Sequence, residues 1–171
     1  MVCRGMSAFP IDWATWSPVT PATLMFIVRD GMVLLIEKKR GHGAGKVNGP
    51  GGKIDPGETP LEAAVRETQE ELGITPQAPR KLGELWFAMS DVPDILCHVY
   101  RADGFEGEPV ETAEAVPMWT PLDAIPYERM WVDDIEWLPL LIRETTFRGR
   151  FVFEDETLLW HHVETGMVWE S

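Results

Sequence analysis

Residues 52–74, Gly-Lys-Ile-Asp-Pro-Gly-Glu-Thr-Pro-Leu-Glu-Ala-Ala-Val-Arg-Glu-Thr-Gln-Glu-Glu-Leu-Gly-Ile, carry helix signals at both ends of one segment. Thr59 is followed three positions later by Glu62, which is the capping-box pattern, and Pro60 suits the first helical position. Gly73 can adopt the left-handed conformation that ends many helices. The sequence therefore predicts a helix that begins at Pro60 and ends just before Gly73.

The side chains of this helix divide between two faces at the helical period of about 3.6 residues. The stripe expected to face the core consists of Leu61, Ala64, Val65, Thr68 and Leu72. Three carboxylates, those of Glu67, Glu70 and Glu71, lie within one turn on another face, next to Ala63. Carboxylates this close repel one another. A solvated acidic surface is the simple alternative, but a hard divalent cation with oxygen ligands would relieve the repulsion.

The residues around the acidic face favour the metal-binding alternative. Glycines at positions 49, 51, 52 and 57 indicate a loop whose backbone can approach a phosphate closely. Arg66 adjoins the carboxylates and can orient Glu58 or Glu67 through a bidentate pair.

The segment resembles the Nudix box, GX5EX7REUXEEXGU, in which U is a bulky apolar residue. Every fixed position matches, namely Gly52, Glu58, Arg66, Glu67, Glu70, Glu71 and Gly73, and Ile74 fills the last U position. Thr68 stands at the first U position; we expect its methyl group to point inward and its hydroxyl to bond a carbonyl one turn back. The resemblance implies an α/β (α+β) fold of Nudix type, an α/β/α sandwich around a central mixed sheet. It also implies hydrolysis that depends on Mg²⁺, with Mn²⁺ as an alternative.

Outside the box, the chain of 171 residues has the length and the apolar content of one domain. Residues 1–20 are interpreted as an N-terminal extension, part of which packs through Trp13 and Trp16, and residues 21–171 as the Nudix hydrolase domain. Strands are expected over 24–29, 32–37, 82–90, 95–101, 115–120, 147–153 and 157–164, and a long loop over 38–52. A short helix is expected to start in 121–125 and a longer one to cover 133–144.

The resemblance extends to the MutT-homologue oxidised purine nucleoside triphosphatases, through residues 38–53, 130–141 and 147–153. It implies that the metal ligands are Glu67, Glu70, Glu71, Glu114 and the backbone carbonyl of Gly51. The residues implied to line the base and sugar pocket are Thr23, Lys38, Asn48, Trp131, Asp133 and Asp134. Lys53 corresponds to a lysine beside the phosphates, next to Gly51 and Gly52. The general base is left open among Glu67, Glu70 and Glu114.

Elementary chemistry makes the pocket assignments reasonable. Trp131 can stack on a purine, and Asn48 can both donate to and accept from a base edge. Two adjacent carboxyls, Asp133 and Asp134, can share one proton and so read either a 6-oxo or a 6-amino edge. The alternatives are that Trp131 is a core residue and that Asp133 caps a helix.

Several residues call for other interpretations. Val47, His42, Pro50 and Ala115 depart from residues common in these enzymes, at positions that can border the pocket. The four histidines, His42, His98, His161 and His162, have no metal-ligand spacing and are interpreted as surface or packing residues. Cys97 is expected to be buried rather than nucleophilic.

Composition narrows the range of partners. The net charge of −13 disfavours nucleic-acid polymers and anionic membranes, which bind basic surfaces. Two isolated cysteines, no signal peptide and no long apolar run favour a cytoplasmic protein, expected to be a monomer. The expected activity is hydrolysis of 8-oxo-dGTP and 2-hydroxy-dATP to the monophosphate and pyrophosphate, which sanitises the nucleotide pool. The alternatives are a Nudix hydrolase of another nucleotide, such as another dNTP, a dinucleoside polyphosphate or ADP-ribose, and a weakly catalytic nucleotide-binding module.

Overall fold

The computed structural model describes residues 11–169, so Cys3 and the first half of the expected extension lie outside the described residues. In chain order, the elements are β1 (Thr20–Arg29), β2 (Met32–Lys38), β3 (Val47–Asn48), β4 (Gly51–Lys53), α1 (Pro60–Leu72), β5 (Thr75–Gln77), β6 (Arg80–Ala88), β7 (Ile95–Ala102), β8 (Gly104–Glu106), β9 (Ala115–Pro121), the 3-10 helix η2 (Tyr127–Arg129), α2 (Asp134–Ile142), β10 (Phe147–Glu154) and β11 (Thr157–Thr165).

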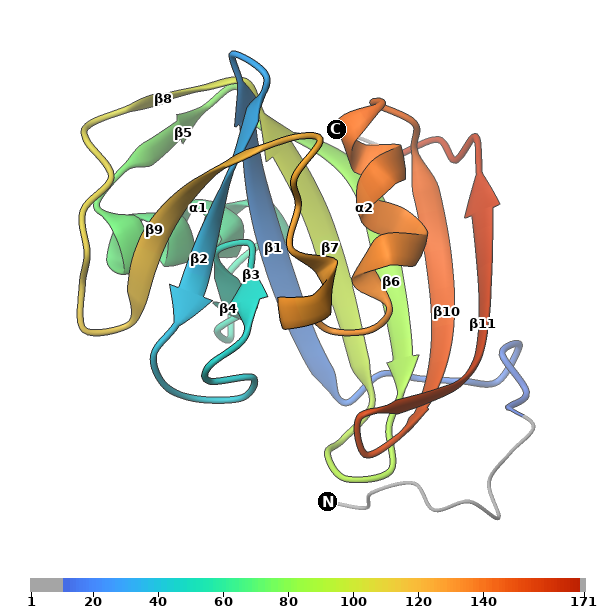
Figure 1. Ribbon diagram of the computed structural model, residues 1–171. Helices are drawn as coiled ribbons and strands as arrows, with labels where there is room; N and C mark the ends of the chain where they lie inside the picture. Colours follow the sequence, from blue (N-terminus) through green and yellow to red (C-terminus); the bar gives the residue numbers. More distant parts are fainter. Residues whose placement is uncertain (1–10, 170–171) are drawn as a thin grey trace.

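Nine strands form one mixed sheet in the order β11-β10-β6-β7-β1-β2-β3, with β4 beside β1 and β9 beside β2 (Figure 1). β1 runs parallel to β7 and β10 runs parallel to β6, while the remaining pairs of this sheet are antiparallel. The helices α1 and α2 cover opposite faces of the sheet (Figure 1). This arrangement confirms the predicted α/β/α sandwich with a central mixed sheet.

The central strand β1 is buried on both faces, which explains why its sequence is a continuous apolar run. Phe26 and Val28 pack in the core under α2, together with Trp137. Met25 and Ile27, which alternate with them, pack in the core under α1. Successive side chains of a strand point to opposite faces, so one strand supplies both cores.

The predicted helix boundaries of α1 are confirmed by its caps. Thr59 and Glu62 form the capping box, and Gly73 ends the helix with a φ of 72°. The hydroxyl of Thr68 donates to the carbonyl oxygen of Ala64 at 2.7 Å, as expected. Leu61, in the first turn of the helix, was wrongly placed on the core-facing stripe, since it is 40% exposed.

The face of α1 that carries the three carboxylates and Ala63 is less exposed than the sequence pattern indicates. Ala63 is fully buried and Glu71 is only 4% exposed. The reason is that β4 lies against this side of the helix and covers it, a contact that residues 60–72 alone do not reveal.

Other boundaries differ where short-range patterns are weak. β1 begins at Thr20, four residues earlier than expected, and the expected loop over 38–52 contains β3 and the start of β4. The prediction of a short helix that starts in 121–125 is wrong, because Pro121 ends β9. In this region of the described chain the only turn of helix is η2. The longer helix covers Asp134–Ile142 rather than 133–144, and β5 and β8, three residues each, were not predicted.

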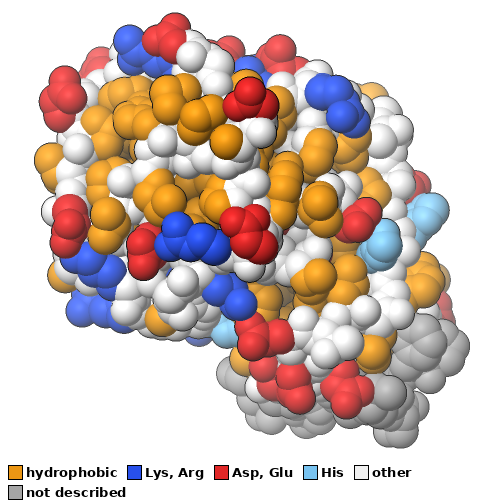
Figure 2. Space-filling view, viewed as in Figure 1, with side chains coloured by type: hydrophobic (Ala, Val, Ile, Leu, Met, Phe, Trp, Pro, Cys, Tyr) orange, Lys and Arg blue, Asp and Glu red, His pale blue; other side chains and the backbone are white. Residues whose placement is uncertain are grey.

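The surface is mixed in character. On the face shown in Figure 2, carboxylate side chains are spread among hydrophobic ones, and lysines and arginines form small groups rather than one broad basic area. No helix of the described chain is long and apolar enough to cross a membrane.

Candidate active site

The strand β4 brings two glycines into places where no side chain fits. A Cβ on Gly51 would lie 2.0 Å from the carbonyl oxygen of Thr23, and a Cβ on Gly52 would lie 2.7 Å from the carboxylate of Glu67. Both positions therefore require glycine, because only its missing side chain lets β4 pass between β1 and α1.

Two carboxylates of α1 face this strand and lie against each other. Glu71 accepts a hydrogen bond from the backbone N–H of Gly51 at 2.9 Å, and the side chains of Glu67 and Glu71 are close enough for each to affect the pKa of the other. Burial raises the pKa of Glu71 to about 8 and also raises the pKa of Glu67. Glu70 is different: its side chain is 55% exposed.

Arg66 ties the box together. Its Nε and Nη2 donate to the two carboxylate oxygens of Glu58 at 2.6 and 2.9 Å, and its Nη1 donates to Glu67 at 3.0 Å. The hydrogen bonds from Arg66 lower the pKa of Glu58 to about 2, and a backbone N–H at Asp55 contributes to this. The guanidinium thus contacts both carboxylates that the sequence offered as its partners, and it holds Glu67 in place against β4.

Glu114 lies in the segment before β9. It is ion-paired with Arg40, whose guanidinium lowers the pKa of the carboxyl group. Residues 11–169 contain no group of three or more histidine, cysteine, aspartate or glutamate side chains arranged around one point as a metal site. Of the predicted metal ligands, Glu67, Glu70 and Glu71 lie within one turn of α1, but their side chains do not converge on one point, and Glu114 is paired with Arg40.

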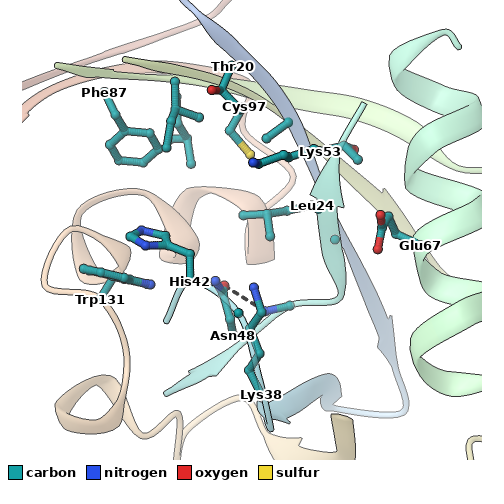
Figure 3. A pocket seen from close by; sticks show the side chains of 18 of the residues that line it. Thr20, Leu24, Lys38, His42, Asn48, Lys53, Glu67, Phe87, Cys97 and Trp131 are labelled. Carbon is teal, nitrogen blue, oxygen red and sulfur yellow. Dashed lines mark hydrogen bonds between the residues drawn. The ribbon is translucent and has the colours of Figure 1, made fainter. Parts of the chain in front are cut away.

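A cavity of about 650 Å³ connects the box to the far end of the sheet. Of the predicted site residues, those that line it are Thr23, Lys38, Asn48, Gly51, Gly52, Lys53, Glu67, Glu71, Glu114, Trp131, Asp133 and Asp134. Glu58, Arg66 and Glu70 are not among its lining residues. In Figure 3, Glu67 lies at one end, Trp131 lies at the other, and the amino group of Lys53 points into the space between them.

The end of the cavity away from the box contains a buried pair of carboxyl groups. Asp133 and Asp134 are each 3% exposed, and Asp133 accepts a hydrogen bond from the indole N–H of Trp137 at 2.8 Å. Burial raises the pKa of both groups, and the charge of Asp133 raises that of Asp134 further. Oδ2 of Asp134 has no hydrogen-bond partner among the described residues. Asp133 occupies the N-cap position of α2 without a side-chain capping bond, so the capping alternative is wrong.

Trp131 lies at the mouth of this end and is partly exposed, so it is not the core residue of the alternative interpretation. The ring of His42 stacks on it with the centroids 5.0 Å apart, and Nζ of Lys46 lies 4.8 Å from the indole centroid. Figure 3 shows His42 directly beside Trp131, and both residues line the cavity. His42 therefore forms part of the cavity wall, which the interpretation as a surface or packing residue did not foresee.

The comparisons with known proteins agree with this geometry. A family model described as the NUDIX domain matches residues 18–141. The chain belongs to the Nudix family. It is similar to the "Oxidized purine nucleoside triphosphate hydrolase" of Danio rerio, with 44% identity covering 82% of this chain and 90% of that protein. The Mus musculus protein of the same name is 41% identical, covering 78% of this chain and 86% of that protein. Among solved structures, the MutT protein from Bacillus halodurans matches with a TM-score of 0.78 and 27% identity, covering 85% of this chain and 98% of that chain.

Several residues that line this Nudix cavity were not predicted from the sequence. The apolar ones include Leu24, Phe87, Met89, Ile95 and Phe153. Apolar residues on a strand look alike whether they face a core or a cavity, so alternation alone cannot identify them. Cys97 also lines the cavity; it is 5% exposed and burial raises its thiol pKa, which confirms a packing role over a nucleophilic one.

Nudix hydrolases generally need a divalent cation, and the donor chemistry of the box fits one. Glu67 and Glu71 provide adjacent oxygen ligands, and a hard cation beside them would offset the cost that burial imposes on their charged forms.

Proposed function

We propose that this Nudix enzyme hydrolyses oxidised purine nucleoside triphosphates, such as 8-oxo-dGTP and 2-hydroxy-dATP, to the monophosphate and pyrophosphate. One observation carries the proposal: a single cavity contains the carboxylates of the box at one end and the buried pair Asp133 and Asp134 at the other. The printed names of the fish and mouse relatives support the same substrate class.

The triphosphate would lie at the box end of the cavity. Glu67, Glu70 and Glu71, with the carbonyl of Gly51 and with Glu114, would hold Mg²⁺, or Mn²⁺ in its place. The cation supplies charge neutralisation for the phosphates as the anhydride bond breaks. The amino groups of Lys38 and Lys53 line the same space and add positive charge beside the phosphates.

Arg66 would position the carboxylate of Glu67. By holding Glu67 while it is anchored to Glu58, it fixes one candidate base at the edge of the cavity. Glu67, Glu70 and Glu114 are the candidates for the group that takes a proton from the attacking water.

The purine would lie at the other end of the cavity. Trp131 offers an aromatic face, and the amide of Asn48 offers a donor and an acceptor, of which Oδ1 already accepts from the N–H of Gly49 at 2.8 Å. One shared proton on Asp133 and Asp134 lets the pair present either a donor or an acceptor to the base. This is the physical basis on which one pocket could accept both a 6-oxo and a 6-amino purine.

A panel of triphosphates assayed with Mg²⁺ tests the proposal. We expect 8-oxo-dGTP and 2-hydroxy-dATP to be turned over at least about tenfold faster than dGTP and dATP, the ratio that about one charge-assisted hydrogen bond provides. Asp134→Asn should change the ratio of the two oxidised substrates, whereas Glu108→Gln, at an exposed position after β8 and outside the cavity lining, should not. Equal turnover of oxidised and ordinary purines would contradict the proposed substrate class.

We further propose that residues 21–171 form the catalytic domain, with 1–20 as an extension, and that the protein acts as a cytoplasmic monomer. The net charge of −13 and the scattered basic side chains in Figure 2 support the absence of a nucleic-acid or anionic-membrane partner. Light scattering on the purified protein would test the monomer.

A further inference from the structure

The segment 11–19, which we call the N-terminal strap, lies mostly before the part of the chain that matches the family, yet it packs on the sheet. The indole of Trp16 stacks on that of Trp86 in β6, with centroids 5.2 Å apart and planes 15° apart. Trp13 adds ring contacts to Trp16, Trp86 and Trp160. The packing of part of the extension through these tryptophans is thereby confirmed, and Figure 1 shows the strap passing the ends of β6 and β7.

The strap also makes directed hydrogen bonds, and they converge on one residue. The indole N–H of Trp16 donates to Oδ2 of Asp94 at 2.9 Å. The backbone N–H groups of Val19 and of Thr20, the first residue of β1, both donate to the carbonyl oxygen of Asp94 at 3.0 Å. The other carboxylate oxygen, Oδ1, accepts from the N–H of Met89 at 3.0 Å. Asp94 is 7% exposed, so these bonds are largely shielded from water.

Asp94 lies in the loop between β6 and β7, and this loop forms one wall of the cavity. Met89, Val92, Pro93 and Ile95 line the cavity at that wall. One carboxylate oxygen of Asp94 bonds the N–H of Met89 within the loop, and the other bonds the indole of Trp16 in the strap. The strap therefore holds this loop through Asp94.

We propose that Trp16, acting through Asp94, is a positioning residue that holds the β6–β7 wall of the substrate cavity in its binding conformation. The inference rests on the proposed function in one respect, that this cavity receives the nucleotide. A hydrogen bond to a buried carboxylate is stronger than a neutral one, so its loss weakens the tie between the strap and the loop. The loop would then spend less time in the conformation that binds the nucleotide, and apparent affinity falls by the same factor.

The consequence is specific, because the carboxylates of the box lie on α1, outside this network. Loosening the loop should raise KM and leave kcat unchanged. Trp16→Phe is the appropriate change, since phenylalanine keeps an aromatic ring on Trp86 but has no N–H group. Trp13→Phe is the matched control, because the described contacts of Trp13 are with aromatic rings.

The test combines kinetics on the full-length protein, using 8-oxo-dGTP and Mg²⁺, with hydrogen exchange of the amides of 89–95 and thermal unfolding. For Trp16→Phe we expect KM and the exchange rates to rise about tenfold, with kcat within about twofold of wild type. Trp13→Phe should change each quantity less than about twofold, and Asp94→Asn should move KM and exchange in the same direction as Trp16→Phe.

Two results would overturn the inference: equal effects of Trp16→Phe and Trp13→Phe on KM and on exchange, or a parallel fall of kcat and unfolding temperature in both variants. If wild-type protein does not turn over 8-oxo-dGTP, the proposed function fails, and the exchange comparison alone then decides whether Trp16 holds the loop.

Discussion

Replacing Glu71 by glutamine should make the metal-free protein more stable while it removes metal binding and turnover. In the folded, metal-free protein, burial raises the pKa of Glu71 from 4.5 to about 8. A carboxyl group whose pKa is raised on folding stabilises the protein fully below its unfolded pKa, and this stabilisation is lost as the pH rises through the folded pKa. Wild type without metal should therefore lose stability between about pH 4.5 and pH 8.

The magnitude follows from that interval. At pH 7, keeping Glu71 protonated costs about 3.4 kcal/mol, which is about 1.36 kcal/mol for each pH unit above 4.5. Because the charge of Glu67 contributes to the raised pKa of Glu71, the two groups titrate together, and we expect roughly 1.5–3 kcal/mol. Glutamine is neutral and can still accept from the N–H of Gly51 and donate to Glu67, so the variant avoids this cost. For a chain of this size the gain corresponds to roughly 4–10 °C in unfolding temperature.

Thermal and urea unfolding in EDTA at pH 5 and pH 7.5 would measure the gain, and the same experiments with Mg²⁺ would measure its reversal. With Mg²⁺, wild type should be stabilised by ligand binding, whereas Glu71→Gln should gain little and lose at least about 100-fold in turnover. Glu70→Gln is the control for stability, since that side chain is 55% exposed and should change it by less than about 0.5 kcal/mol. A Glu71→Gln protein that is less stable than wild type in EDTA at pH 7.5 would refute this reasoning.

Three further predictions concern stability and positioning. Thr68→Val should change the free energy of unfolding by less than about 1 kcal/mol, because the helix keeps its main-chain hydrogen bonds; a loss above about 2 kcal/mol in urea unfolding would contradict it. Burial lowers the pKa of His98 to about 4 from 6.5, so the unfolded state alone takes up this proton as the pH falls through that interval. The free energy of unfolding of His98→Gln, relative to wild type, should therefore rise by roughly 1–3 kcal/mol when the pH is lowered from about 7.5 to about 4.5. Urea unfolding that shows the same pH dependence for both proteins would rule this out. Arg66→Lys, which cannot make the bidentate pair with Glu58, should lower kcat roughly 10–100-fold, whereas Arg80→Lys on the surface should leave it unchanged.

The sequence predicted the helix α1 to the residue because chemistry fixes both of its ends locally. Thr59 and Glu62 cap its start, and Gly73 adopts the left-handed conformation at its end. The strands β3 and β4 have two and three residues, too few to show an alternating pattern. β4 exists because glycines let it pair with β1, and that pairing depends on a strand nearly 30 residues away in sequence, as in the pair Thr23 and Gly52.

In the candidate site, too, features set by neighbouring residues could be predicted, whereas features set by residues far apart in the sequence could not. The carboxylates of the box could be found from spacing, because they lie on one helix. The role of Asp94 could not, since an aspartate in a turn looks like a surface residue, and its partner Trp16 lies 78 positions away in the sequence. His42 was missed for a similar reason: its contact with Trp131 is set by the loop after β2, which has no regular pattern.

The two ends of the cavity belong to different parts of the architecture. The box end is built on α1 and β4, while the other end is built from α2 and from loops after β2 and β6, and β1 is the strand that runs between them. Substitutions in those loops can therefore alter which base is admitted without moving the carboxylates. A duplicated copy of such a chain could diverge toward a different nucleotide through a few loop changes and inherit its hydrolytic chemistry intact.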